Sequence, residues 1–132
     1  MNQIDWGNLT FSLTPTKSMF ISHWENGTSW TGGELIPFGD IPMSPAAAVL
    51  NYGQGIFEGL KAFRTAKDRI ILFRPDKNIE RAILSAERLC IPIVPSDLFM
   101  DGLLKVVKDN SEYIPPSDKG SLYIRPIIWG TG

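Results

Sequence analysis

Alternating apolar and polar side chains predict a β-hairpin near the start of the chain. In residues 19–25 every second side chain falls on the same face, as in a strand. Asn26-Gly27 follows, and this dipeptide is favoured in two-residue hairpin turns because both positions tolerate positive φ. We therefore expect a return strand at residues 29–31, and an extended loop over residues 32–45, which glycine and proline interrupt.

A second hairpin is expected in the middle of the chain, and a single strand at its end. Residues 56–64 and 69–74 are rich in branched and aromatic side chains, and the turn-forming residues 66–68 separate them. Residues 121–129 predict the last strand. The apolar row of that strand is Leu122, Ile124, Pro126 and Ile128.

Between these strands the apolar period changes to that of a helix. Residues 76–89 and 96–110 carry apolar side chains at spacings of three and four. A shorter helix is expected to begin with Ser44 as its N-cap and to end before Gly53. Strands in runs beside a helical pair predict an α+β fold, in which two helices pack on one face of a mostly antiparallel sheet. The first long helix would bury Ile79, Ala82, Ile83, Ala86, Leu89 and Cys90.

Composition fits a single domain over residues 1–132. The chain is 43% hydrophobic, and a chain of this length can bury a real core. The net charge of −1 provides no basic surface for nucleic acid, and no segment has the length of a membrane span. The N-terminus has neither the basic start nor the apolar run of a targeting peptide, so we expect a cytoplasmic protein.

Three side chains that often carry chemistry are expected to be structural here. His23 is the only histidine, so a metal site or a Ser-His-Asp triad lacks its other members, and we expect His23 to be partly buried. Cys90 lies on the apolar helix face and is expected to pack. Lys61 has no neighbour in its strand that would make its amine a nucleophile, so we expect it to point outward.

The strongest candidate for a binding site is on the last strand. Tyr123 and Arg125 are two residues apart, so they share the face opposite the apolar row. A guanidinium in so apolar a strand needs an anion as its partner. Two interpretations stay open. Arg125 binds the carboxylate of a small ligand, with Tyr123 adding a hydroxyl donor, or it pairs with Glu58 or another acid of the chain.

Arg81, Tyr52 and Phe57 are further candidates. Arg81 lies nearly opposite the apolar stripe of its helix, so it is either a solvated surface arginine or a contact for an anion such as phosphate. The glycines near Tyr52 permit a tight backbone path that would present Tyr52 and Phe57 to a cavity. Packing in the core and turn accounts for the same two aromatic residues equally well.

Several motifs together give the chain a family resemblance. Residues 50–63 (LNYGQGIFEGLKAF), 72–75 (LFRP) with 78–81 (NIER), 88–92 (RLCIP) and 122–126 (LYIRP) occur in one order. In these motifs the chain resembles the N-terminal small domain of branched-chain amino-acid aminotransferases, which are pyridoxal-phosphate enzymes of fold type IV. The resemblance covers most of the chain, and the combination is specific although each motif alone is weak.

The resemblance implies a role for each candidate residue. Arg81 matches the arginine that holds the phosphate of pyridoxal 5'-phosphate. Tyr52 and Phe57 match aromatic residues around the substrate side chain, and in the family's homodimer the tyrosine reaches the site of the partner subunit. Tyr123 and Arg125 match the pair that seats substrate, the arginine serving the second carboxylate of glutamate or 2-oxoglutarate.

The chain departs from the family in what it lacks. The lysine that forms the Schiff base, the glutamate at the pyridine nitrogen and much of the phosphate site belong to a C-terminal domain that would follow Gly132. None of the lysines of this chain matches the catalytic one. We therefore expect no catalytic residue in this chain and no turnover by the chain alone.

The complete enzyme is expected to transfer amino groups reversibly between leucine, isoleucine or valine and 2-oxoglutarate. One alternative is a relative within the fold type, a D-amino-acid aminotransferase or an aminodeoxychorismate lyase. Residues 123–126 and 57–61 favour the branched-chain group. The other alternative is a truncated, non-catalytic paralogue that acts only through contacts with other proteins.

Overall fold

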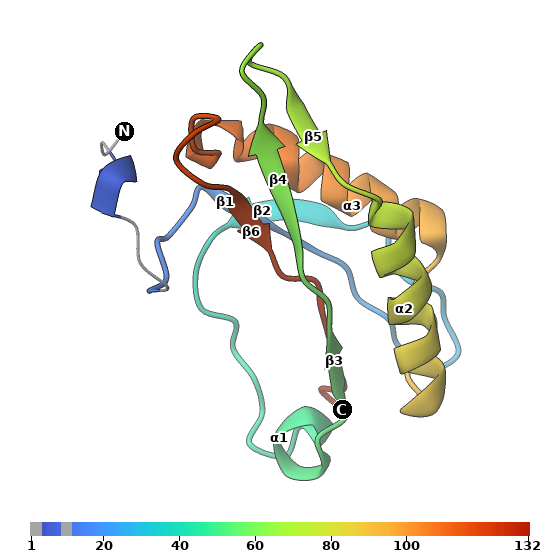
Figure 1. Ribbon diagram of the computed structural model, residues 1–132. Coiled ribbons are helices and arrows are strands. Elements are labelled where there is room, and N and C mark those ends of the chain that lie inside the picture. The colour runs from blue at the N-terminus through green and yellow to red at the C-terminus, as the bar shows by residue number, and fades with distance from the viewer. Residues whose placement is uncertain (1–3, 9–11) are drawn as a thin grey trace.

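The computed structural model describes residues 4–8 and 12–132. This part of the chain forms three small antiparallel sheets, with strand orders β1-β2, β3-β7 and β5-β4-β6, and three α-helices (Figure 1). The predicted α+β class with antiparallel sheet is thereby confirmed. The strands are β1 (Ser18–Ile21), β2 (Glu34–Pro37), β3 (Gly55–Phe57), β4 (Leu60–Arg64), β5 (Ile70–Leu72), β6 (Leu122–Ile124) and β7 (Ile127–Trp129). The helices are α1 (Ala48–Tyr52), α2 (Pro75–Arg88) and α3 (Ser96–Asp109), with 3₁₀ turns at Trp6–Asn8 and Ser111–Tyr113.

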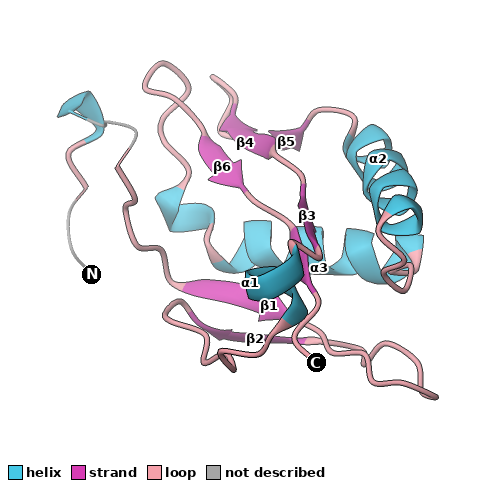
Figure 2. Ribbon diagram, turned by 90° about the horizontal axis from the view of Figure 1, so that it is seen from below, coloured by secondary structure: helices cyan, strands magenta, loops and turns pink. Residues whose placement is uncertain are grey.

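Helix α3 lies between the three-stranded sheet and the β1-β2 ribbon (Figure 2). Towards the sheet it buries Leu103 and Val107. Towards the ribbon it meets the ring of Phe20, which lies so close that a Cβ at Gly102 would be 2.8 Å from Phe20 Cδ1. Helix α2 adds Ile79 to the same core, so both long helices pack on the inner face of the sheet as predicted. The buried members of this core are Leu60, Ala62, Ile79, Leu103, Val107, Ile114 and Ile124.

Two strands that the sequence predicted as continuous are broken in the structure. One break separates β3 from β4 at Glu58 and Gly59, and the other separates β6 from β7 at Arg125 and Pro126. Pro126 has no N–H to give to a ladder, which favours a break at this point. The Glu58 N–H donates to the Pro126 carbonyl at 3.0 Å, so the two breaks lie opposite each other. Both chain segments therefore pass from the β3-β7 sheet to the three-stranded sheet at neighbouring points, one from β3 to β4 and the other from β7 to β6.

The predicted hairpin at Asn26-Gly27 is correct in its turn and wrong in its return strand. Gly27 has φ +81°, but the segment after the turn is not a strand, and β1 pairs with β2 inside the predicted loop. The Thr31 N–H donates to the His23 carbonyl at 2.8 Å. The His23 N–H, however, donates to the Thr31 hydroxyl at 3.0 Å instead of a backbone carbonyl. The Thr31 side chain thus takes the place of the backbone carbonyl that would accept from His23 in a regular strand pair.

The predicted long helices agree with the structure within one residue at each end, whereas the short helix begins later. Helix α1 starts at Ala48 because the Ala47 N–H donates to the Ser44 carbonyl at 3.0 Å, which places Ser44 in a turn. Ser44 is therefore not the helix N-cap that the sequence suggested. Gly53 ends α1 with φ +66°, as expected of a left-handed C-cap.

The structure corrects two of the three side-chain predictions. Cys90 is exposed, because α2 ends at Arg88 and Cys90 itself has φ +54°, which turns its side chain away from the apolar stripe. Leu89, which follows the end of α2 directly, is also exposed, at 41%. His23 is exposed beside the Asn26-Gly27 turn instead of partly buried. Lys61 points outward from β4, as predicted.

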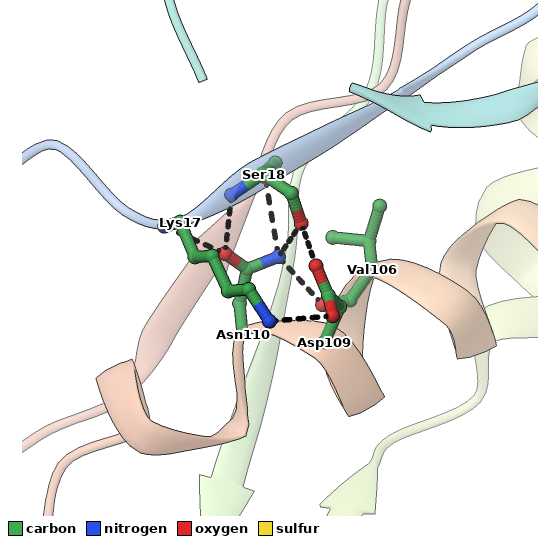
Figure 3. A network of polar contacts seen from close by, with 5 residues as sticks. All are labelled: Lys17, Ser18, Val106, Asp109 and Asn110. Carbon is green, nitrogen blue, oxygen red and sulfur yellow. Dashed lines mark hydrogen bonds and ion pairs between the residues drawn. The ribbon is translucent and has the colours of Figure 1, made fainter. Parts of the chain in front are cut away.

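A polar network joins β1 to the end of α3 (Figure 3). The buried Asn110 amide accepts hydrogen bonds from the N–H groups of Lys17 and Ser18, at 3.0 and 2.9 Å, and donates to the Ser18 carbonyl at 3.1 Å. Asp109 accepts a hydrogen bond from the Ser18 hydroxyl and forms an ion pair with Lys17 at 3.0 Å. These two donors lower the pKa of Asp109 from its usual value. The network fixes the N-terminal strand without a further strand beside it.

Candidate functional site

The alternation predicted for the last strand is confirmed and defines one exposed face. Along β6 and β7 the side chains of one row are exposed, and those of the other row are buried or half-buried. Phe57 on β3 is 67% exposed, which adds a third aromatic ring near this face. The exposed row is Tyr123, Arg125, Ile127 and Trp129.

Arg125 is held by aromatic side chains. Its Nη2 donates to the Tyr123 hydroxyl at 2.8 Å, and its Cζ lies 4.5 Å from the centre of the Phe57 ring and 5.1 Å from that of Tyr123. Cation–π contacts at such distances orient a guanidinium without neutralising it. Within residues 4–8 and 12–132, Arg125 makes no ion pair. The structure therefore brings together three of the predicted residues and leaves the charge of Arg125 available to an anion.

Gly59 permits this arrangement, and the sequence analysis did not identify it. A Cβ at Gly59 would overlap the Tyr123 hydroxyl and lie 2.9 Å from Tyr123 Cζ. The Tyr123 ring thus rests directly on the backbone at the break between β3 and β4. The available signal was the glycine in an otherwise branched and aromatic strand pattern, which often marks a close approach of another group.

A shallow hollow of about 290 Å³ lies beside Arg125. Its walls are largely apolar and aromatic, and Arg125 provides the cationic group among them. This volume is near the lower end of the range for small-molecule sites, which begins at roughly 300 Å³. The hollow suits a small apolar group next to an anionic one. Its lining residues are Val49, Gly53, Gly55, Ile56, Phe57, Arg125, Ile127 and Trp129.

Glu58 pairs with Arg81 and not with Arg125. Arg81 Nε lies 3.2 Å from Glu58 Oε1, and Arg81 Nη2 lies 2.9 Å from Glu58 Oε2. Asn78 Nδ2 also donates to Glu58 Oε2, at 3.2 Å, and to the Gly59 carbonyl at 3.1 Å. The alternative in which Glu58 neutralises Arg125 is therefore wrong. Sequence reasoning missed Asn78, whose spacing from Arg81 on α2 places both on one side of the helix.

Tyr52 stands apart from the other predicted residues. It ends α1, is 86% exposed, and does not line the hollow. The described residues contain no group of three or more His, Cys, Asp or Glu side chains arranged to hold a metal ion. None of their helices combines the length and the apolar character needed to cross a membrane.

Comparison with known proteins identifies relatives of this chain. No family model matches it. It is 50% identical over 129 residues to a chloroplastic branched-chain amino acid aminotransferase 2 of Humulus lupulus, covering 98% of this chain and 32% of the relative. It is 46% identical over 129 residues to branched-chain-amino-acid aminotransferase 6 of Arabidopsis thaliana, covering 98% and 36%. A methionine aminotransferase of Arabidopsis thaliana is 44% identical, again over 98% of this chain and 36% of the relative.

Solved structures show the same relationship. The branched-chain aminotransferase of Escherichia coli superposes with a TM-score of 0.61 and 26% identity, over 74% of this chain and 30% of that one. A second branched-chain aminotransferase, in complex with N-(5'-phosphopyridoxyl)-L-glutamate, gives a TM-score of 0.60 and 30% identity, over 88% and 34%. Both are fold type IV aminotransferases, which confirms the predicted fold. Over nearly its whole length the chain is therefore similar to branched-chain aminotransferases, and it spans about one third of the length of the relatives that it matches.

Proposed function

We propose that this chain is the N-terminal small domain of a pyridoxal-phosphate-dependent branched-chain aminotransferase. The reaction of the complete enzyme would be reversible amino transfer between leucine, isoleucine or valine and 2-oxoglutarate. The chain itself contributes no catalytic residue, and the reactive lysine belongs to a C-terminal domain. The relatives named above, with identities of 46% and 50% over 98% of the chain, support this proposal.

One observation carries the proposal: the guanidinium of Arg125 is oriented, accessible and not paired with an acid of the described residues. Tyr123 and Phe57 fix its position, and the apolar hollow adjoins it. A guanidinium presents several N–H donors in a fixed plane, which matches a carboxylate. An arginine with no role in binding would be expected to pair with a neighbouring acid or extend into water.

This arrangement explains how one site serves two kinds of substrate. The exposed aromatic wall of Phe57 and Trp129 would be covered by a branched aliphatic side chain, and removing this apolar surface from water favours binding. Arg125 at the edge of the same wall binds the distal carboxylate of glutamate or 2-oxoglutarate, and the Tyr123 hydroxyl is close enough to contribute a further hydrogen bond. A substrate without that carboxylate leaves Arg125 resting on the aromatic rings, so no buried charge is left without a partner.

The residues present also fit the proposed cofactor. Glu58 occupies two of the five N–H donors of the Arg81 guanidinium, and the Arg81 side chain is 64% exposed. The remaining donors suit a phosphate group. When bound, pyridoxal 5'-phosphate supplies the electron sink for amino transfer. Arg81 would hold its phosphate.

We further propose that the complete enzyme is a homodimer in which Tyr52 contacts the site of the partner subunit. The high exposure of Tyr52 and its position outside the hollow support a contact of this kind. Light scattering on the complete protein tests the assembly. A monomer with full activity would contradict it.

The experiment that tests the function begins with the reading frame after residue 132, which should encode a lysine-bearing domain. The complete protein is then assayed with leucine, isoleucine, valine and D-alanine as amino donors. Arg125→Ala should raise KM for 2-oxoglutarate by roughly 10- to 100-fold, because a hydrogen bond to a charged group contributes about 1.5–3 kcal/mol. KM for leucine should change far less.

The matched control is Arg69→Ala, which removes an exposed arginine from the turn between β4 and β5. It should leave both KM values unchanged. Equal effects of Arg125→Ala on leucine and on 2-oxoglutarate would refute the carboxylate role. Transamination of D-alanine in place of leucine would instead support the D-amino-acid alternative, and the absence of a downstream lysine domain would support a non-catalytic paralogue.

A second candidate substrate is methionine. A relative named methionine aminotransferase is 44% identical to this chain over 98% of its length. An unbranched thioether suits an apolar hollow as well as a branched aliphatic chain does. Adding methionine to the donors in the same assay separates the two. The cytoplasmic location stays a prediction, because the relatives include chloroplastic and mitochondrial proteins, and cell fractionation would test it.

A further inference from the structure

The contact between Glu58 and Arg81 is unusual for its unequal burial. The Glu58 side chain is only 10% exposed, whereas that of Arg81 is 64% exposed. A carboxylate withdrawn from water must receive hydrogen bonds from the protein. Glu58 receives them from Arg81 and from the buried Asn78, which also bonds the Gly59 carbonyl. The position of Glu58 is therefore fixed by the break between β3 and β4 and by α2.

The geometry of the pair decides which part of Arg81 remains free. Glu58 contacts Nε and Nη2, which form one edge of the guanidinium plane. Three N–H donors remain, two on Nη1 and one on Nη2, and one donor of each nitrogen lies along the end of the plane. Two oxygens of a phosphate match this end as well as a carboxylate matches the side. An anion and Glu58 can therefore share one guanidinium from different edges.

We propose that Glu58 is a positioning residue, which holds Arg81 in the orientation that binds a phosphate group. This inference rests on the proposed function, in which Arg81 is the phosphate ligand. An exposed arginine on a helix otherwise samples many rotamers, and fixing such a side chain when a ligand binds has an entropic cost that weakens the affinity. Glu58 removes that cost before the ligand arrives. The negative charge of Glu58 also repels the phosphate. If orientation dominates, replacing Glu58 will weaken phosphate binding, and if charge dominates, removing the charge will strengthen it.

The test uses the complete protein in its cofactor-free form, titrated with inorganic phosphate and with pyridoxamine 5'-phosphate, which has no aldehyde to react with lysines. Affinity is measured by calorimetry. The N–H signal of Arg81 Nε is followed by NMR, because it exchanges slowly only while it is hydrogen-bonded. In Glu58→Gln and in Glu58→Asp we expect this signal to weaken, and the affinity to fall roughly two- to tenfold, because the Arg81 side chain must then be ordered when the ligand binds.

The two variants separate orientation from charge. Glu58→Asp keeps the charge and withdraws the carboxylate by one methylene, whereas Glu58→Gln keeps the length and removes the charge. If charge alone matters, Glu58→Asp will bind as the unsubstituted chain does, and Glu58→Gln will bind more tightly. The control is Glu80→Gln, which removes an acid next to Arg81 in sequence whose partner is Lys77 and not Arg81. It should leave the Arg81 signal unchanged.

Failure of this inference and failure of the proposed function give different results. If Arg81→Ala abolishes phosphate binding while both Glu58 variants retain it with an unchanged Nε signal, only the positioning role is refuted. If neither ligand shifts the Arg81 signal in the complete unsubstituted protein, Arg81 is not the phosphate ligand and both proposals are refuted. Circular dichroism of each variant confirms that it is folded before its affinity is compared.

Discussion

Truncation of Asn110 to alanine should destabilise the chain more than almost any other polar substitution. The Phe38 N–H donates to the Lys17 carbonyl at 3.1 Å, so that carbonyl faces residue 38, whereas the Lys17 N–H donates to Asn110 Oδ1 at 3.0 Å. In an antiparallel ladder the next residue directs its N–H and carbonyl away from its partner. Those of Ser18 therefore point to the other edge of β1, where the Asn110 amide meets them.

The magnitude follows from the groups that would lose their partners. Ser18 is 8% exposed and Asn110 is 1% exposed, so water does not readily replace the amide. Two groups keep a partner in Asn110→Ala. The Val106 carbonyl still accepts a hydrogen bond from the backbone N–H of residue 110, and the Ser18 hydroxyl still donates to Asp109. That leaves the Ser18 N–H and carbonyl unpaired, at about 1–3 kcal/mol each. The Lys17 N–H also loses Asn110, but Lys17 is exposed and water can replace that partner. We expect a loss of roughly 3 kcal/mol in the free energy of unfolding.

Urea unfolding followed by circular dichroism measures this loss. With a slope of about 2 kcal/mol/M, the midpoint of Asn110→Ala should fall by roughly 1.5 M. The control is Asn26→Ala in the exposed hairpin turn, which should stay within about 0.5 kcal/mol of the unsubstituted chain. If Asn110→Ala is no less stable than Asn26→Ala, the Asn110 amide is not the partner of that edge of β1.

Three other predictions follow from the described contacts. Gly59→Ala should displace the Tyr123 ring, which NMR would detect as a large shift of its ring protons; an unchanged spectrum would contradict the close packing on Gly59. The pKa of Asp109 is lowered in the folded chain, so its contribution to stability is present above its unfolded pKa of about 3.9 and is lost as the pH falls below it. Asp109→Asn should flatten that decline in acid melts, and an equally steep decline would count against the network. Finally, the exposed aromatic side chains Tyr52, Phe57 and Phe73 should make the isolated chain self-associate, and a stable monomer in light scattering would disprove this.

The candidate site could be predicted in part from spacing. The two-residue period placed Tyr123 and Arg125 on one face, and the structure confirms this. The same period could not say which acid lies near which arginine. Glu58 was a reasonable partner for Arg125, yet the breaks in both strands bring Glu58 to Arg81 on α2 instead. A pairing across three elements depends on how they pack, which periodicity does not encode.

The errors at the start of the chain have a related cause. Asn26-Gly27 does favour a turn, and the turn forms. Whether a strand follows depends on what its edge can bond. Here β2 pairs with β1 along its whole length. On the opposite edge of β1, the Ser18 N–H donates to Asn110, which lies more than ninety residues away in sequence. Cys90 was misplaced because a helix boundary that moves by one or two residues changes which face the last side chains occupy.

The sequence by itself determined the class of fold, the positions of the two long helices, and the row of side chains that carries Tyr123 and Arg125, because each of these depends on local periodicity. Tertiary structure decided the partner of each arginine, the breaks at Glu58 and Pro126, and the close packing of Tyr123 on Gly59. These features depend on the distances between segments that are remote in sequence. Such distances are set by the packing of α2 and α3 against the sheet, and no local pattern contains them.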